Sequence, residues 1–228
     1  VTAQTTGKLF LSLGKTLGTD SVREIQHVEE EIVSMARAWG VASDEVIADV
    51  AKMNDQFAFL GKNSIEVAKQ LKGISLATKV STDSITGFTE QFAFMEDGIG
   101  VASRLNTAFG KTVINAEEMN RMFYEGQQGE MYNKMIGGMV DNMDQLNAQT
   151  AEGASLRRLY AKEMKMEGAE LAGLLNKLEK ENVTRGNLSN WLTVNADKRK
   201  EEAHAAERYA TVQQSLNKLQ EQFAIAIG

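Results

Sequence analysis

Not one of the 228 residues of this chain is proline. An average usage of about 5% would predict about 11 prolines in a chain of this length. Proline removes a backbone hydrogen bond and clashes with the preceding turn, which destabilises a helix by about 3 kcal/mol. Helices can therefore continue anywhere in this chain until a glycine or a capping residue ends them. The sequence predicts an all-α fold.

Apolar residues recur at helical spacing in segments that Gly, Ser, Thr or Asn separate. The predicted helices span residues 2–17, 21–39, 43–60, 64–80, 82–109, 116–125, 131–146, 154–166, 170–183 and 188–194. Gly73 predicts a bend or a close contact with another helix. The pair Gly98 and Gly100 predicts a kink in the longest pattern, or its division into two helices.

The predicted helix caps indicate how these helices are arranged. Ser43, Thr82 and Asn115 each precede or accompany acidic residues at a helix start, and they lie 39 and 33 residues apart. Such spacing is typical of helical hairpins stacked side by side. We therefore expect one elongated multi-helix domain over residues 1–195.

The segment from Ala102 to Phe123 combines a helix end, a short connector and a helix start. Gly110 ends the first helix, because glycine enters the left-handed C′ conformation without steric strain. After four residues, Asn115 is placed to cap the second helix, and Glu117 and Glu118 lie beside its positive end. Nothing in this segment is typical of catalysis.

This segment resembles a recurring unit of the tail tape-measure proteins of long-tailed, myovirus-like bacteriophages. The pattern is a helix ending Leu-Asn-x-x-Phe-Gly, a gap of four, then Asn-Ala-x-Glu-Met-x-Arg-Met. Residues 36–47, Ala-Arg-Ala-Trp-Gly-Val-Ala-Ser-Asp-Glu-Val-Ile, are similar to another unit of these proteins, and the resemblance covers about residues 20–180.

The resemblance implies a structural role in the virion tail, with assembly in the host cytoplasm. Tape-measure proteins are bound by tail assembly chaperones, set the length of the tail tube, occupy its lumen and leave ahead of the DNA. The implied partners are the tail tube, the baseplate hub and further copies of the chain, often as trimers. No enzyme activity, cofactor, small-molecule substrate or specific nucleic-acid site is implied. Whether this segment measures length or anchors at the baseplate stays open.

The last 33 residues, 196–228, differ from the rest. Residues 197–208 are mostly charged, and apolar residues then follow in steps of 3 and 4, as in the a/d seam of a coiled coil. The seam consists of Tyr209, Val212, Leu216, Leu219, Phe223 and Ala226. We expect an exposed helix through which copies of the chain associate. Because the chain starts at Val1 and ends within an apolar pattern, we also expect a piece of a longer polypeptide.

Charge and composition narrow the function classes. The formal net charge is −6, which argues against a general nucleic-acid binder. The chain has no cysteine, so disulfides and thiolate chemistry are excluded. No apolar run reaches the length of a membrane helix. Another helical component of a virion, baseplate or secretion apparatus would share these properties and is the main alternative.

Three sequence patterns are candidates for a phosphate site, a metal site and a partner-binding groove. Residues 14–16 and 110–112 both read Gly-Lys-Thr, the end of a phosphate-binding loop, but the required upstream glycine is replaced by Leu9 and Leu105. Glu24 with His27, and Glu201 with His204, have the Glu-x-x-His spacing of ferritin-like di-iron proteins, which leaves such a protein as a remote alternative. Four methionines at i+4 steps, Met131, Met135, Met139 and Met143, predict a packing stripe or a partner groove.

Overall fold

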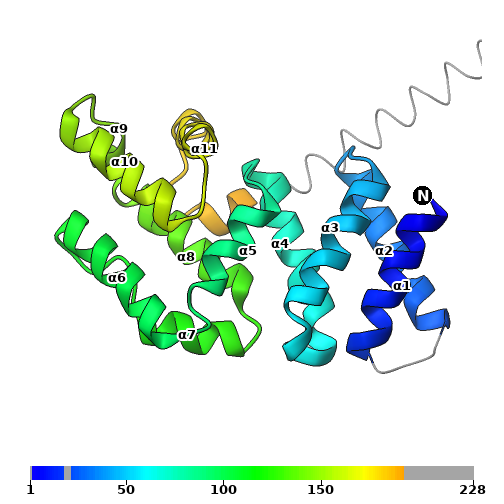
Figure 1. The fold of residues 1–228 in the computed structure, drawn as a ribbon. Coiled ribbons are helices and arrows are strands. Elements are labelled where there is room, and N and C mark those ends of the chain that lie inside the picture. The colour runs from blue at the N-terminus through cyan, green and yellow to red at the C-terminus, as the bar shows by residue number, and fades with distance from the viewer. Residues whose placement is uncertain (1, 18–21, 193–228) are drawn as a thin grey trace, which may run out of the picture.

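The computed structural model describes residues 2–17 and 22–192 (Figure 1). No residue of these two ranges lies in a β-strand, so the predicted all-α class is confirmed for them. The elements are α1 Ala3–Leu17, α2 Val22–Ala38, α3 Ser43–Gln56, the 3-10 helix η1 Ala58–Asn63, α4 Ser64–Thr78, α5 Thr82–Glu90, α6 Met95–Phe109, α7 Ala116–Tyr124, α8 Gln128–Val140, α9 Met143–Asn147, α10 Ala151–Glu163 and α11 Gly168–Lys180. The seam from Tyr209 to Ala226 and the boundary at residue 195 lie outside the described residues.

The helices form an elongated row of antiparallel hairpins, as the cap spacing predicts (Figure 1). At one end, α3 packs against α1, α2 and α4. At the other end, α6 packs against α7 and α10, and α11 packs against α10. Helix α4 lies between the two ends and contacts α3, α5 and α8. It is the link between them, which explains why buried residues occur on almost every side of it.

Gly73 on α4 makes room for the ring of Trp39, which directly follows α2. A Cβ atom added at Gly73 would lie 3.0 Å from Cη2 of Trp39, which is tighter than an ordinary van der Waals contact. Glycine within a helix is less stable than alanine by about 1 kcal/mol. Here the missing side chain makes room for an indole ring. The contact predicted at Gly73 is present, but its partner is a side chain of the turn after α2 rather than a helix.

The predicted helix 82–109 is divided into two helices, but the division is not at Gly98 and Gly100. Helix α5 ends at Glu90 and α6 begins at Met95, whereas Gly98 and Gly100 lie within α6. The fully buried ring of Phe92 lies between the two helices. A Cβ atom at Gly98 would be only 2.9 Å from this ring. The glycine therefore accommodates the ring, and the chain breaks where Phe92 turns into the core.

The predicted helix 131–146 is also two helices, with Asp141 and Asn142 between α8 and α9. The side-chain amide of Asn142 donates a hydrogen bond to the Gly138 carbonyl oxygen, 2.6 Å away. Such a bond competes with the helical pattern of the backbone and favours a helix end.

The methionines of this region lie in the core. Met131, Met135 and Met139 are fully buried, and Met143 packs against the core from a partly buried position. The stripe is therefore interior packing. The alternative, an open methionine groove for a partner, is wrong.

The connector between α6 and α7 has the predicted construction. Gly110 has a φ angle of +63° and follows the last residue of α6. Oδ1 of Asn106 accepts hydrogen bonds from the backbone N–H groups of Val113 (2.6 Å) and Ile114 (3.0 Å). Oδ1 of Asn115 accepts one from a backbone N–H in the first turn of α7, 3.0 Å away. The cap at Asn115 is confirmed, and Asn106 fixes the connector.

The other two predicted caps are each displaced by one residue. The cap of α5 is Ser81 rather than Thr82, and its Oγ accepts a hydrogen bond from the Ser84 N–H at 3.2 Å. The cap of α3 is Ala42 rather than Ser43, and no side chain bonds to the free amides there. Helix α3 begins without the stabilisation that a polar cap supplies.

Candidate interaction groove

An open groove of about 960 Å³ lies on the described surface. Residues of α2 and α4 line one side, and residues of α7 and α8 line the other. Leu192, the last described residue, also lines it.

The floor of the groove is apolar. Met35, Trp39, Ile74 and Met122 contribute to it, and both Ile74 and Met122 are otherwise part of the buried core. Trp39 is only half-buried, so part of its indole ring is available to a ligand. An apolar floor of this kind is typical of surfaces that bind proteins or small apolar groups.

Ion pairs neutralise the rim on both sides. On the α4 side, Lys69 Nζ lies 3.0 Å from Oε2 of Glu31 and 2.5 Å from Oε1 of Glu66. Burial alone would lower the pKa of Lys69, but hydrogen bonds to these two carboxylates outweigh it and raise that pKa. On the opposite side, Lys134 Nζ lies 3.1 Å from Oε1 of Glu118. These cations are already paired, so the rim does not have the free positive charge of a phosphate site.

One polar group of the groove lacks a partner. Oδ1 of Asn133 is inaccessible to solvent and accepts no hydrogen bond from any described residue. An unsatisfied buried acceptor destabilises the protein by about 1–3 kcal/mol.

Among the described residues, the Glu-x-x-His pattern of α2 meets no further side chains that could hold a metal ion with it. The His27 side chain is 72% exposed, and its Nε2 lies 3.4 Å from Oε1 of Glu31, one turn further along the helix. Within residues 2–17 and 22–192, no three His, Asp or Glu side chains converge closely enough to hold a metal ion. His204 lies outside the described residues.

The two Gly-Lys-Thr patterns are at the wrong ends of helices to bind phosphate. Residues 14–16 belong to the last turn of α1, and Gly110 directly follows the last residue of α6. Helix C-termini expose carbonyl oxygens, whereas phosphate loops use the amides of a helix N-terminus. Both patterns are helix ends and not nucleotide sites.

An ion pair with a buried carboxylate joins two helices that are far apart in the sequence. Nε and Nη2 of Arg104 on α6 donate to Oε1 and Oε2 of Glu163 on α10, at 2.8 and 2.7 Å. Glu163 is 2% exposed, whereas the Arg104 side chain is 49% exposed. The bidentate bond raises the pKa of Arg104 further above its ordinary value. Nothing in the sequence pairs these two residues, which are 59 positions apart.

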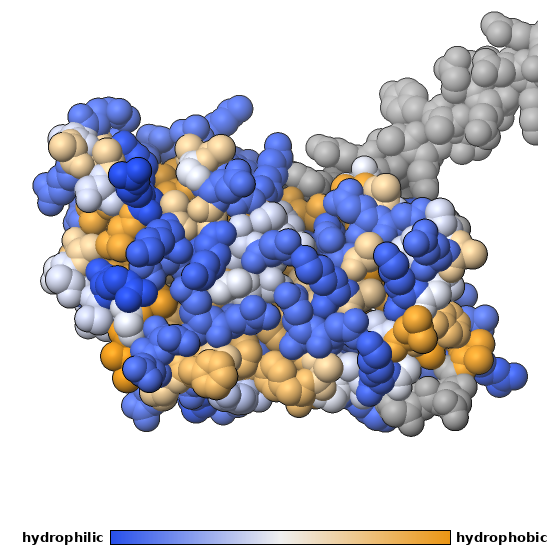
Figure 2. All heavy atoms as spheres, viewed as in Figure 1, coloured by the Kyte–Doolittle hydropathy of each residue, from blue (hydrophilic) through white to orange (hydrophobic). Residues whose placement is uncertain are grey.

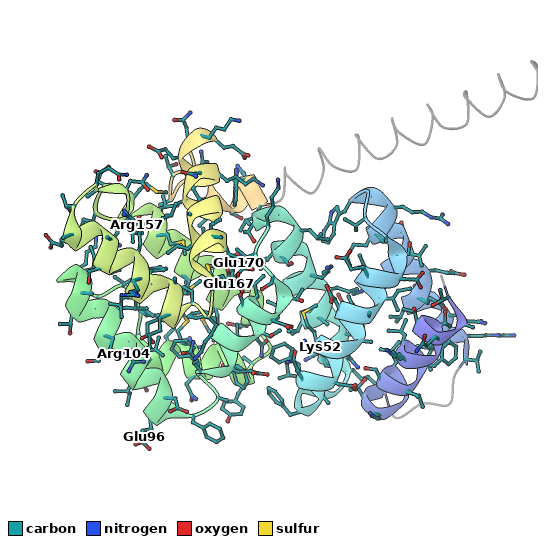
Figure 3. All side chains as sticks on the ribbon, turned by 45° about the horizontal axis from the view of Figure 1, so that its top comes forward. Lys52, Glu96, Arg104, Arg157, Glu167 and Glu170 are labelled. Atoms are coloured by element: carbon teal, nitrogen blue, oxygen red, sulfur yellow. The ribbon has the colours of Figure 1, made fainter. Side chains whose placement is uncertain are left out.

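A second carboxylate has a structural role between α11 and α5. Glu170 accepts hydrogen bonds from the Ser81 N–H (2.9 Å), the Ser84 hydroxyl (2.9 Å) and the Glu167 N–H (3.1 Å). Figure 3 shows Glu167 and Glu170 side by side at the start of α11. Burial alone would raise the pKa of Glu170, but these hydrogen bonds outweigh it and lower the pKa. The carboxylate of Glu170 therefore links α11 to the start of α5.

Comparison with known proteins returns no relative. No protein-family model matches the chain, and no curated protein or solved structure is significantly similar to it. Among the described helices, none has the length and apolar character needed to cross a lipid bilayer.

Proposed function

We propose that this chain is a structural segment of a phage tail tape-measure protein. The observation that carries the proposal is the resemblance of residues 102–123 to the recurring helix–connector–helix unit of those proteins. Its main sequence features, Gly110 and Asn115, have the helix-ending and helix-capping roles that such a unit requires. Stacked hairpins with no proline are also in keeping with a structural component.

In this role the parent protein lies in the tail tube or at the baseplate and is released when DNA is ejected. Its partners are the tail tube and baseplate hub proteins, with assembly chaperones before the tube forms. Copies associate as trimers through the seam from Tyr209 to Ala226, because a short apolar seam needs neighbouring helices to cover it. We propose no enzymatic activity.

The composition of purified tails tests the proposal. Peptides of this chain are expected among tryptic peptides of tails from the virus that encodes it, and deletion of its coding region should abolish tails or change their length. Unchanged tails after the deletion would contradict the proposal. Peptides found instead in a secretion apparatus would support the alternative class.

The size of the change in tail length distinguishes a segment that sets this length from one that attaches to the baseplate. A continuous helix extends by about 1.5 Å per residue, so 228 residues would span about 340 Å. The described residues are folded into hairpins and are therefore much shorter than such a helix. A change in tail length near 1.5 Å per deleted residue indicates measuring, and loss of tails indicates anchoring.

Association of the chain is tested by sedimentation. A trimer of the 25.1 kDa chain has a mass of about 75 kDa. Leu216→Asp with Leu219→Asp should give a monomer, because charge in an a/d seam opposes helix pairing. Leu11→Asp is the matched control, since Leu11 is 70% exposed on α1 and lies outside the seam. A wild-type monomer would contradict the association.

A further inference from the structure

Five large apolar side chains are exposed along one edge of the molecule. We call this surface the aromatic edge, and its members are Phe59 (52% exposed), Phe94 (70%), Met95 (39%), Ile99 (54%) and Tyr124 (55%). Figure 2 shows hydrophobic residues along the lower edge of the molecule. Isolated apolar residues are normal on a surface, whereas a contiguous group marks an interaction site.

The contacts of these residues make the aromatic edge continuous. The rings of Phe59 and Tyr124 are 6.0 Å apart in an edge-to-face arrangement. The Tyr124 hydroxyl donates a hydrogen bond to the Ala93 carbonyl oxygen, 2.7 Å away, and Phe94 is the next residue. Met95 follows, and Ile99 lies one turn later on α6. The surface therefore runs from η1 across the end of α7 to the start of α6.

Folding does not account for the most exposed member. Phe94 is the N-cap residue of α6, and its side chain makes no capping hydrogen bond. A serine or aspartate at such a position would stabilise the helix by about 1 kcal/mol. Phe92, only two residues earlier, is fully buried and supplies the core contact of this bend. The ring of Phe94 therefore contributes little to the stability of the fold.

The flanking charges define what the aromatic edge can bind. The charges close to the aromatic edge in sequence are mostly acidic. Glu90, Glu96 and Asp97 lie close to Phe94 and have no ion-pair partner among the described residues. On the basic side, Arg121 beside Tyr124 is paired with Glu125, which leaves Lys62 beside Phe59 as the unpaired cation among the described residues there. Glu96 is at the lower edge in Figure 3. Glu96 and Asp97 also stabilise the start of α6, because they lie beside the positive end of the helix dipole. Both residues remain exposed to solvent.

Electrostatics select among the possible occupants. A second copy would bring the same carboxylates against each other, which opposes symmetric pairing. Nucleic acids and anionic membranes are repelled for the same reason. A helix with an apolar stripe flanked by Lys or Arg complements both the apolar row and the acidic rim.

We propose that the aromatic edge is a docking surface for a basic amphipathic helix of a partner protein. The apolar stripe of that helix packs on Phe94 and Tyr124, and its cations pair with Glu90, Glu96 and Asp97. None of its residues belongs to the predicted seam of residues 209–226, so the inference does not depend on the tape-measure proposal.

The test uses the full chain and two synthetic helical peptides as probes. Both peptides have the same leucine stripe over about five turns, one with lysine flanks and the other with glutamate flanks. Fluorescence anisotropy of labelled peptide measures binding. We expect the lysine peptide to bind at least about tenfold more tightly than the glutamate peptide.

Substitutions assign the binding to the aromatic edge. Phe94→Ser with Tyr124→Ser should weaken binding of the lysine peptide by about tenfold or more, and Glu96→Gln with Asp97→Asn should weaken it and reduce its salt dependence. Leu11→Ser is the control for an exposed apolar residue elsewhere, and it should change nothing. Circular dichroism verifies that each variant is folded.

Several outcomes would overturn the proposal. Equal binding of both peptides, or an equal effect of Leu11→Ser, would show that the attraction is non-specific. A wild-type oligomer that Phe94→Ser with Tyr124→Ser dissociates would identify a second copy as the occupant. Binding to zwitterionic lipid vesicles that the same variant loses would identify a membrane instead.

Discussion

Two apolar rows of this protein differ in their surroundings. Met131, Met135 and Met139 on α8 are fully buried, whereas Phe94 and Tyr124, both on the aromatic edge, are more than half exposed. Helix α8 contacts α4, α5, α7 and α9 and is covered by them. The aromatic edge lies at the ends of η1, α6 and α7, where no described helix covers it. Regular spacing within a central helix indicates core, and apolar residues gathered at helix ends indicate a surface for partners.

Truncating one methionine in each row should give the largest difference. Met135→Ala leaves a cavity in the core and should destabilise the protein by about 2–5 kcal/mol. Met95→Ala removes the same atoms from the aromatic edge and should change stability by less than about 0.5 kcal/mol. Denaturant unfolding followed by circular dichroism measures both values. Equal losses would remove the distinction between the rows.

Two ion pairs, one with a buried carboxylate and one exposed, should differ in the same way as the two apolar rows. Arg104→Ala leaves the carboxylate of Glu163 buried without its bidentate partner and should destabilise the protein by about 1–3 kcal/mol. Arg121→Ala removes an exposed pair with Glu125, whose atoms lie 3.4 Å apart, and should have an effect below about 0.5 kcal/mol. Denaturant midpoints of the two variants check this order. A smaller loss for Arg104→Ala than for Arg121→Ala would contradict the account.

Substitutions at two helix caps should change the stability by smaller amounts. One should destabilise the protein and the other should stabilise it. Asn115→Ala removes the capping bond of α7 and should destabilise the protein by about 1 kcal/mol. Ala42→Ser supplies a hydroxyl at the uncapped start of α3, where the backbone is already extended, and should stabilise by up to a similar amount. Thermal unfolding measures both. A loss of stability in Ala42→Ser would show that α3 does not begin as described.

The smallest effect is expected from the pH dependence of Glu170. The folded state lowers its pKa below the ordinary value of about 4.3, so it stabilises the protein above that pH. This contribution is lost as the pH falls through the folded-state pKa. The stability difference between wild type and Glu170→Gln should therefore shrink below about pH 4. A difference that stays constant from pH 7 to about pH 3 would rule out a contribution from the Glu170 charge.

Local sequence patterns predicted most of the helices. They failed where the end of a helix depends on contacts with residues far away in the sequence. Gly110 and Asn115 act within a few residues of themselves, so their roles could be predicted from the sequence. The break before α6 depends on how Phe92 packs into the core, which the local spacing of residues 82–109 does not determine.

The candidate sites depend even more on tertiary contacts. The groove exists because α2 and α4 lie opposite α7 and α8, and the bond of Arg104 to Glu163 spans 59 positions. The aromatic edge joins residues of three elements. No local spacing rule brings such residues together, whereas the buried methionine row follows the helical repeat and was found from it.

Oxidation of the methionines by hydrogen peroxide, followed by peptide mass spectrometry, tests the contrast between core and edge most directly. In the folded full chain, Met95 should be oxidised well before Met131, Met135 and Met139, and all four should react at similar rates in denaturant. Oxidation of the three α8 methionines as fast as Met95 in the folded protein would contradict the account.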